Sequence, residues 1–587
     1  MCASVHTGGT RMAQEVIKAI FKCFNDNQNF VLEAGAGAGK THALMEAIEY
    51  LQYDFYKVAA IQPNILCITY TNVAKDEINS RILTHKNIYV NTMHEFLWEF
   101  MNQYQNELIK FVLELIEADK FQLSSEIDKA QKLIDKPRSN TNIEDKKAII
   151  IKNTERLKKY ENISLTKITY ESYRALYKGV ISHDDILTLA IKCLDNTVFA
   201  NIFTNSFTHI LIDEFQDTDA KILSKLLDVI KSKKEKDDSY LVIGLFGDEM
   251  QRIYSNSPLQ IDYNLYKFLS IPKLENYRTC EKIIIANNSL RGDGLKQNHK
   301  NLDVKFNKLQ FVYNLSSDIY LKNYDEIDIS EYKRLFLSHR QIAAEIGFDS
   351  ISNIFSIEYG RYSNDKLLKM EDSFITAILS NVVNLLYAYQ SKSFELIIKK
   401  IGLNSFKKLQ FEVLCSNIDE LLKCNATLER VINVLDESHI QINRKKIEDI
   451  ISNYKERDKE QFINDLLCVE IDQYINLFKQ INGKTQMQTL HGVKGTEFSH
   501  VIINMFANQP WTTYNFDNLF LHGLDGSAAV YNAHKLFYVA CTRAKSSLII
   551  NYITDNEDKD LCDNMLENIK NVFGGLIETR CYLPLSN

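Results

Sequence analysis

The chain has 587 residues and a formal net charge of −7, with 45% hydrophobic and 25% charged residues. This length exceeds what one hydrophobic core supports, so we expect about three or four domains, and the composition excludes a disordered protein. The acidic balance excludes a uniformly basic surface that coats nucleic acid, but it leaves room for a narrow groove that binds one strand. Only 6 prolines and 20 glycines occur, which favours long helices.

The sequence has neither an apolar run of about 18 residues nor a leader with basic and apolar blocks. We therefore expect a cytoplasmic protein without a membrane partner. The 11 cysteines are scattered, and none forms a Cys-x-x-Cys pair. This pattern favours a reduced protein with buried thiols such as Cys67 and argues against a zinc site.

Short apolar runs that end in polar residues predict buried strands of parallel α/β sheets. The predicted strands lie at residues 30–32, 65–68, 209–212, 241–246, 501–504 and 548–550. Ligands in such folds gather at the carboxyl ends of the strands, where the polar residues fall. Residues 101–179 and 366–483 instead repeat Leu, Ile, Lys and acidic residues at helical spacing, which predicts two helical insertions. The charged run at 231–238 predicts a solvated helix end or loop.

A glycine-rich stretch, EAGAGAGKT at 33–41, follows the first predicted strand. Its glycines allow backbone N–H groups to turn onto phosphate oxygens, and the following helix adds its N-terminal dipole. Lys40 is expected to reach the β- and γ-phosphates of ATP, and Thr41 to bind Mg²⁺. Ala34 replaces the first glycine of the common pattern. The residues expected to cradle the phosphates are Ala34, Gly35, Ala36, Gly37, Ala38 and Gly39.

Two carboxylates, Asp213 and Glu214, follow the apolar run at 209–212. Asp213 is suited to hold magnesium directly or through a water, and Glu214 to orient and deprotonate the attacking water. An isolated Asp-Glu pair after apolar residues is more often a helix cap or a loop. The upstream phosphate loop makes the catalytic interpretation the stronger one.

With these two motifs in order, the chain resembles the superfamily 1 helicases of the UvrD/PcrA/Rep type. ITYTNVA at 68–74 and NTMH at 91–94 resemble the family's first DNA-contacting motifs, and GDEMQRIY at 247–254 resembles the segment that links ATP to DNA. The resemblance implies that Gln14 reads adenine, although its spacing is long and a surface glutamine is almost as good an interpretation. It also implies DNA contacts by Tyr70, Thr71, Asn72, Thr92, His94 and Tyr254.

Three further stretches extend the resemblance, namely LENYRT at 274–279, TLHGVKGTEF at 489–498 and LFYVACTRAK at 536–545. They imply that Tyr277 stacks on adenine while Arg278 reaches phosphate. Glu497 is expected to hold the ribose, and His491 to lie near the DNA. Arg543 is implied to be the arginine finger. Gln251, from the stretch at 247–254, is implied to sense the γ-phosphate.

The family resemblance implies an α/β fold with two RecA-like P-loop lobes, each with a parallel sheet and a mainly helical insertion. The expected first lobe comprises residues 1–100 and 180–272, with its insertion at 101–179. The expected second lobe comprises 273–365 and 484–587, with a reduced insertion at 366–483. Arg278, Glu497 and Arg543 are expected on the opposite side of ATP from Lys40. Lobe closure would then move single-stranded or partly duplex DNA, 3′ to 5′ and without base readout.

The compact size and the motifs also resemble the helicase-like subunit of the Gabija anti-phage system, which acts beside a separate nuclease protein. One departure is Asn256, where the family usually has a tryptophan that stacks on bases. This change leaves open a regulatory ATPase that senses DNA or nucleotides and unwinds little; a DNA-repair helicase and an RNA substrate also remain open. A metabolic P-loop kinase would leave every motif after residue 247 unexplained.

Overall fold

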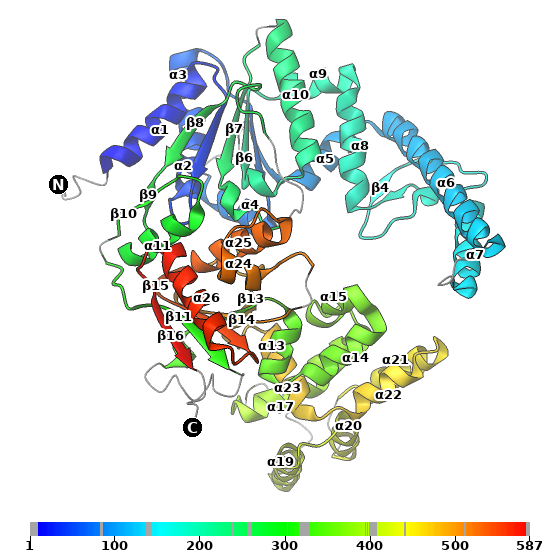
Figure 1. Cartoon of the computed structure of the whole chain (residues 1–587). Helices are drawn as coiled ribbons and strands as arrows, with labels where there is room; N and C mark the ends of the chain where they lie inside the picture. Colours follow the sequence, from blue (N-terminus) through cyan, green and yellow to red (C-terminus); the bar gives the residue numbers. More distant parts are fainter. Residues whose placement is uncertain are drawn as a thin grey trace. The chain divides into compact units, whose positions relative to one another are not determined.

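A computed structural model describes most of the chain. The described residues are 10–82, 86–136, 142–237, 239–254, 261–301, 303–315, 328–393, 395, 397, 408–438, 442–509 and 512–582. The chain divides into two compact units, residues 1–303 and residues 304–587 (Figure 1). Each unit contains a six-stranded sheet in which all the paired strands are parallel. The expected α/β fold with two parallel sheets is confirmed.

The sheet of the first unit has the strand order β3-β2-β6-β7-β1-β8. Its strands are β1 (Phe30–Ala34), β2 (Ile65–Thr69), β3 (Ile88–Thr92), β6 (His209–Asp213), β7 (Val242–Gly247) and β8 (Leu269–Lys273). The four central strands coincide with predicted apolar runs, because a strand buried on both faces is apolar throughout. The two edge strands β3 and β8 carry exposed residues, so the apolar-run criterion missed them.

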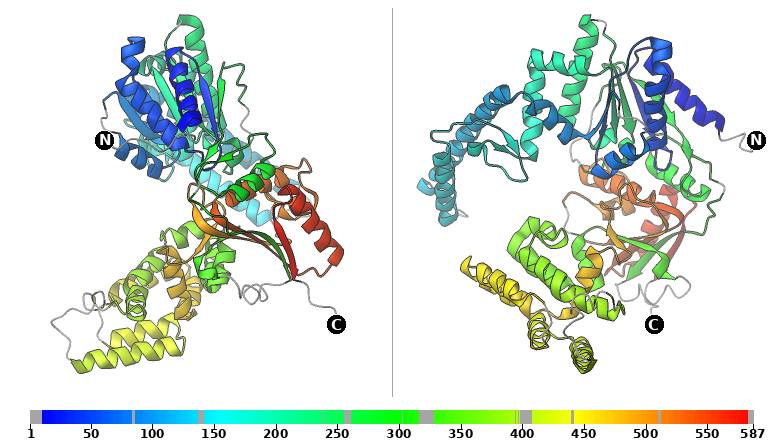
Figure 2. Two further views of the ribbon diagram at one scale, coloured as in Figure 1. Left: turned by 90° about the vertical axis from the view of Figure 1, so that its left-hand side faces the viewer. Right: turned by 180° about the vertical axis from the view of Figure 1, so that it is seen from behind.

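Helices cover both faces of this sheet (Figures 1 and 2). Leu32 and Phe246 pack on one face with α1 (Thr10–Asn25), α2 (Lys40–Tyr53), α3 (Phe55–Ala59) and α4 (Asn72–Arg81). Val31 and Leu245, one residue along each strand, pack on the other face with α5 (Met93–Asn102), α8 (His183–Asp195), α9 (Thr197–Ser206) and α10 (Ala220–Asp237). This alternation follows from the two-residue period of a strand. Residues 231–237 of the charged run fall at the end of α10, and position 238 lies outside the described residues.

The insertion of the first unit is mainly helical, as its sequence predicts. Two long helices, α6 (Gln105–Asp135) and α7 (Ile143–Lys159), lie side by side (Figure 2). They are followed by the short parallel pair β4 (Thr169–Tyr170) and β5 (Val180–Ile181), with the 3-10 turn η1 (Leu176–Lys178) between them. No described helix is by itself long and apolar enough to span a membrane, although the bent pair α8 and α9 passes that test together.

Residues 273–303 belong to the first compact unit, whereas the predicted boundary placed them in the second lobe. The physical reason is that β8 pairs with β1 and leads this segment directly back onto the phosphate loop. The segment contains β9 (Glu275–Asn276), α11 (Glu281–Arg291) and β10 (Asn298–His299). The remaining domain boundaries stay predictions.

The sheet of the second unit has the strand order β13-β12-β14-β15-β11-β16. Its strands are β11 (Lys308–Leu315), β12 (Lys333–Phe336), β13 (Met487–Thr489), β14 (Phe498–Phe506), β15 (Ala544–Thr554) and β16 (Glu578–Tyr582). Helices α24 (Phe516–His522), α25 (Ala528–Cys541) and α26 (Lys559–Val572) follow β14 and β15 along the chain. Phe520 of α24 packs between Phe311 of the sheet and Phe537 of α25, with ring centroids 5.7 and 5.2 Å away.

The helical part of the second unit has its own apolar core. The helices that contribute to this part are α13 (His339–Ile346), α14 (Asp349–Tyr359), α15 (Ser363–Leu368), α16 (Ser373–Ile378), α17 (Asn384–Gln390), α19 (Lys408–Lys423), α20 (Leu428–Glu437), α21 (Arg444–Glu456), α22 (Glu460–Cys468) and α23 (Ile471–Ile481). Ala343 and Ile351, upstream of the predicted insertion at 366–483, already belong to this core. The helical region is therefore confirmed as a feature, and it begins earlier than its composition indicated.

The packing of Phe30 on Gly244 makes a stability prediction. The two residues are register partners in β1 and β7, and a Cβ at Gly244 would lie 2.4 Å from Phe30 Cζ. Phe30 cannot move aside, because it also contacts Phe24 and Phe246. Gly244→Ala should lower the free energy of unfolding by about 1–3 kcal/mol, measured by thermal unfolding. Adding Phe30→Leu should recover part of this loss; a loss that the second change only deepens would contradict the steric account.

Candidate nucleotide-binding and catalytic site

The phosphate loop connects β1 to α2. Gly37 and Gly39 adopt φ angles of +76° and +80°, a left-handed conformation that strains residues with a side chain. Gly39 is also the N-cap residue of α2 and has no side chain with which to cap the helix. The N-cap residue therefore offers no side-chain acceptor to the first backbone N–H groups of α2. Such N–H groups are suited to bind an anion.

Segment 273–303 holds this loop from the carbonyl side. Asn276 Nδ2 and Gln297 Nε2 both donate to Ala36 O, at 2.9 and 3.2 Å, and the backbone N–H of Tyr277 donates to Gly37 O at 2.9 Å. The fit is close, since a Cβ at Gly37 would lie 2.6 Å from Arg278 Cβ. These bonds fix the carbonyl groups of the loop. Sequence reasoning assigned no role to Asn276 and did not identify Gln297 at all.

The acidic end of β6 meets the loop at Lys40. Lys40 Nζ forms an ion pair with Glu214 and lies 3.9 Å from Asp213 Oδ1. Burial favours a neutral amine, but the two carboxylates outweigh it and raise the pKa of Lys40 above its ordinary value. Burial raises the pKa of Asp213 to about 6, against the opposing attraction of Lys40. Three of the residues that the sequence singled out for phosphoryl chemistry therefore lie together.

Glu214 has a strained backbone. Its φ of 49° and ψ of 43° lie in the left-handed region, which a residue with a long side chain rarely adopts. The Gln216 amide group donates to the Glu214 carboxylate, and its Oε1 accepts the backbone N–H of Asp248 at 3.1 Å. Gly247 allows this approach, because a Cβ there would lie 2.2 Å from Gln216 Oε1. The end of β6 is thereby joined to the end of β7.

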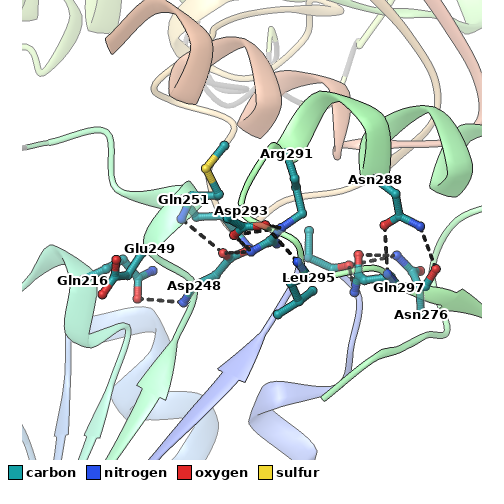
Figure 3. Close-up of polar contacts among 12 residues, drawn as sticks. Gln216, Asp248, Glu249, Gln251, Asn276, Asn288, Arg291, Asp293, Leu295 and Gln297 are labelled. Carbon is teal, nitrogen blue, oxygen red and sulfur yellow. Dashed lines mark hydrogen bonds and ion pairs between the residues drawn. The ribbon is translucent and has the colours of Figure 1, made fainter. Parts of the chain in front are cut away.

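The end of β7 carries a buried polar network (Figure 3). Asp248 accepts from Gln251 Nε2 at 2.8 Å and from both terminal nitrogens of Arg291 at 2.8 and 2.9 Å. Arg291 also donates to Asp293. The 3-10 turn η3 (Glu249–Gln251) begins after Asp248, which caps it through Met250 N. Gln251 was predicted to act in the site, whereas Arg291 lies outside every motif and was missed.

The residues present fit a magnesium ion beside the phosphates. Asp213 Oδ1 is buried and accepts no hydrogen bond from a described residue, so it has a lone pair available for a cation. Thr41 lies in the first turn of α2, half-buried, next to Lys40. Hydroxyl and carboxylate oxygens are the donors that magnesium prefers. Within the described residues, no cluster of three or more His, Cys, Asp or Glu side chains suggests a second metal site.

The remaining candidates for nucleotide binding in this unit lie on the surface. Gln14 is exposed on α1, and the Tyr277 ring is 39% exposed, available for stacking. Lys273 Nζ lies 5.8 Å from the centre of that ring. The same Lys273 pairs at 3.2 Å with Glu275, and both side chains are buried. A buried ion pair thus lies below the exposed tyrosine.

The DNA candidates of the first unit divide into two kinds. Tyr70 and Tyr254 are both exposed and stack on one another, with ring centroids 5.6 Å apart. Thr71 and Thr92 instead use their hydroxyls as N-caps of α4 and α5, so a structural role accounts for both side chains. Asn72, the first residue of α4, is exposed. Asn256 lies outside the described residues.

His94 stacks on His183, with ring centroids 3.5 Å apart and planes inclined by 14°. Burial, together with the neighbouring His183, lowers the pKa of His94 to about 4, although the carboxylates of Asp184 and Asp219 act in the opposite direction. His183 Nδ1 also hydrogen-bonds the Tyr170 hydroxyl at 2.9 Å. A neutral His94 ring can stack or accept a hydrogen bond, but it brings no positive charge toward a phosphate at neutral pH.

Three candidates lie in the second unit. Arg543 is buried, and its guanidinium donates to Val539 O, Thr496 O and the Thr542 hydroxyl at 2.9, 3.1 and 2.8 Å. Glu497 is partly exposed and pairs with Lys545 at 2.6 Å. His491 Nε2 hydrogen-bonds the Tyr514 hydroxyl at 2.8 Å. The bond from Arg543 to Thr496 shows that these two distant motifs meet within the unit.

The His94 environment predicts a pH effect on stability. Between about pH 6.5 and pH 4 the unfolded chain binds a proton at His94 that the folded chain does not, so stability falls as pH falls through this window. The melting temperature of His94→Gln should therefore decline less between pH 7.5 and pH 5 than that of the wild type. The exposed His42 provides the matched control, and His42→Gln should follow the wild type. Identical declines in all three proteins would contradict the burial argument.

Comparisons with known proteins agree with these motifs. The model of the UvrD/REP helicase N-terminal domain matches residues 14–257. Gabija protein GajB of Bacillus cereus (strain HuB5-5) is 28% identical, covering 96% of this chain and 97% of that protein.

Two further relatives are named as helicases. The ATP-dependent DNA helicase PcrA of Bacillus subtilis (strain 168) is 23% identical, and the match covers 90% of this chain and 81% of that protein. A probable DNA helicase II homolog of Mycoplasma genitalium is also 23% identical, and the match covers 89% of this chain and 82% of that protein. The resemblance to UvrD/PcrA/Rep-type helicases is thus confirmed. Residues 14–257 form a UvrD/REP helicase N-terminal domain, in a chain related over most of its length to Gabija GajB and PcrA.

Proposed function

We propose that this chain is an ATP-dependent DNA helicase whose first compact unit binds and hydrolyses ATP. The observation that carries the proposal is the meeting of Lys40, Asp213 and Glu214 beside a phosphate loop, within a UvrD/REP helicase domain. An ammonium group held by carboxylates is ready to exchange them for phosphate oxygens, because both partners are anionic. ATP binding would release Glu214 from Lys40.

The released Glu214 would orient the attacking water and accept its proton, since phosphoryl transfer depends on positioning and electrostatics. Gln251 would contact the γ-phosphate, and Arg278, held against Gly37, would reach the phosphates from segment 273–303. Thr41 and Asp213 would hold magnesium, which neutralises phosphate charge. Tyr277 would stack on adenine and Gln14 would hydrogen-bond its edge. From the second unit, Glu497 would hold the ribose and Arg543 would act as the arginine finger.

For DNA, we propose sequence-independent binding of a single strand and translocation from 3′ to 5′, the direction that the family resemblance implies. The exposed Tyr70 and Tyr254 support this proposal, because stacking on a base carries no base code. Asn72, His94 and His491 would contact the backbone or bases by polar groups. Thr71 and Thr92 would contribute through their positions at helix N-termini.

A finer proposal concerns the partner. We infer that the chain acts beside a separate nuclease protein in anti-phage defence, supported by the likeness to Gabija protein GajB over 96% of the chain. Purification of the native chain with a nuclease would support this role. Repeated purification of the native chain without one would contradict it.

A second candidate is a regulatory ATPase that senses DNA or nucleotide and unwinds little. It is favoured by Arg543, whose guanidinium already donates to three acceptors inside its own unit. A finger held in this way must leave these acceptors before it can reach a phosphate, which would make turnover depend on activation. Strand displacement by the chain alone separates the two candidates, since only the helicase unwinds without a partner.

The central test is ATP hydrolysis with and without single-stranded DNA. DNA should stimulate the wild type, and Glu214→Gln should lower kcat about 100-fold or more while ATP still binds, because general-base catalysis is lost. Lys40→Ala should abolish binding and hydrolysis. The exposed Glu49 on α2 is the matched control, and Glu49→Gln should retain full activity. Hydrolysis that is unchanged in Glu214→Gln would overturn the assigned site.

The hydrogen bonds that Asn276 and Gln297 donate to the phosphate loop predict a specific loss of ATP affinity. In Asn276→Asp the group facing Ala36 O becomes a carboxylate oxygen instead of an N–H donor, while the oxygen that accepts from Arg278 N and Thr279 N is retained. We expect ATP affinity to fall about tenfold, because Ala36 O keeps the donor from Gln297 but loses the one from Asn276 and faces a carboxylate oxygen instead. The measurement is the Kd for ATP by calorimetry. Asn298 is exposed on β10 and provides the matched control, so Asn298→Asp should bind ATP normally. An ATP affinity of Asn276→Asp equal to that of the wild type would contradict the role of Asn276 in holding the loop.

A further inference from the structure

The guanidinium of Arg291 is buried at the end of α11, with its side chain 3% exposed. Its two terminal nitrogens donate to the two carboxylate oxygens of Asp248, at 2.9 and 2.8 Å (Figure 3). Its Nε and one terminal nitrogen donate to Asp293, at 2.9 and 2.6 Å. Only a planar fork satisfies two carboxylates in this way, because an ammonium group cannot present parallel N–H bonds to both.

Asp248 lies at the centre of the polar groups of the site. Its side chain is 1% exposed, so its charge needs partners within the protein. Oδ2 accepts Gln251 Nε2 at 2.8 Å, and Oδ1 accepts the backbone N–H of Met250 at 3.1 Å. Its own backbone N–H donates to Gln216, whose amide group donates in turn to Glu214. Asp248 therefore connects the expected γ-phosphate sensor, through its carboxylate, with the expected general base, through its backbone N–H and Gln216.

The hydrogen bond to Asp248 decides how the Gln251 amide is turned. A carboxylate only accepts hydrogen bonds, so the amide nitrogen of Gln251 must face it and the amide oxygen must point away. Arg291 holds this carboxylate in place by two parallel hydrogen bonds, so the acceptor that the Gln251 amide faces has a fixed position.

We propose that Arg291 is a positioning residue for ATP hydrolysis, which fixes Asp248 and through it the orientation of the Gln251 amide toward the γ-phosphate. The inference rests on the proposed function and deepens it, since Arg291 touches no reacting atom. Segment 273–303 then holds the site at two ends, the phosphate loop through Asn276 and Gln297 and the γ-phosphate side through Arg291.

A purely structural ion pair makes a different prediction. If Arg291 only ties α11 to the sheet, its loss lowers the melting temperature and impairs nucleotide binding and turnover together. If it positions Gln251, its loss lowers kcat and the affinity for a γ-phosphate mimic, while affinity for ADP is retained. The difference arises because ADP has no γ-phosphate for Gln251 to contact.

The experiment uses the full chain. Four variants are compared with the wild type: Arg291→Met, Arg291→Lys, the double variant Arg291→Met with Asp248→Asn, and the control Glu281→Gln, exposed on the same helix. The double variant is needed because Arg291→Met alone buries an unpaired carboxylate and can fail to fold. The readouts are kcat and KM for ATP, the Kd values for ADP and for ADP with beryllium fluoride, and the melting temperature.

We expect kcat to fall at least about tenfold in Arg291→Met and in the double variant, as for loss of a preorganised group at the transferred phosphate. The Kd for ADP should stay within about threefold, while the preference for beryllium fluoride over ADP alone is lost. Arg291→Lys should recover only part of kcat, because lysine lacks the fork. Glu281→Gln should match the wild type.

Two results would overturn the inference. A double variant with wild-type kcat would mean that Arg291 only neutralises a buried charge, and parallel losses of ADP affinity, kcat and melting temperature would mean that the pair is structural. A wild-type chain that hydrolyses no ATP would defeat the proposed function instead. The ratio of the two Kd values needs no turnover, so it would still decide the role of Arg291.

Discussion

A buried carboxylate sets the strictest constraint on the first compact unit. Asp248 emerges from the central strand β7 into a place where its charge is out of reach of water, and an unpaired charge there would be strongly destabilising. Its partners are Gln251 from the next turn and Arg291, which lies 43 residues further along the chain. Satisfying Asp248 therefore requires α11 to pack at the carboxyl end of the sheet, and this packing brings Tyr277 and Arg278 to the phosphate loop.

The parallel sheet explains why polar residues from distant parts of the chain meet. The phosphate loop follows β1, the Asp213–Glu214 pair ends β6, and the network around Asp248 begins at the end of β7. Strands β6, β7 and β1 are neighbours, so their carboxyl ends lie at one edge. Helix N-termini point to the same edge and favour anions. The positive charge of Lys40 is balanced there by the acidic side chains of Asp213 and Glu214.

In the second unit, a buried charged side chain has hydrogen-bond partners of a different kind. Arg543 is buried, and its guanidinium donates to the backbone carbonyls of Val539 and Thr496 within its own unit. The contact also joins Thr496 to the end of α25, so the two stretches around Glu497 and Arg543 form one local structure. An anion could bind the Arg543 guanidinium only by competing with these hydrogen bonds and with the one to the Thr542 hydroxyl.

The sequence alone determined the features that depend on local pattern. Apolar runs identified four strands of the first sheet, because strands buried on both faces are apolar at every position, and glycines marked a loop that needs positive φ at Gly37 and Gly39. Strand ends also predicted that Lys40 and Asp213 would lie close together. Only the tertiary structure decided that residues 273–303 join the first unit, that Gln297 holds Ala36 and that Arg291 holds Asp248. These contacts link residues far apart in the chain, and a buried polar side chain finds its partner by how elements pack, for which no local pattern exists.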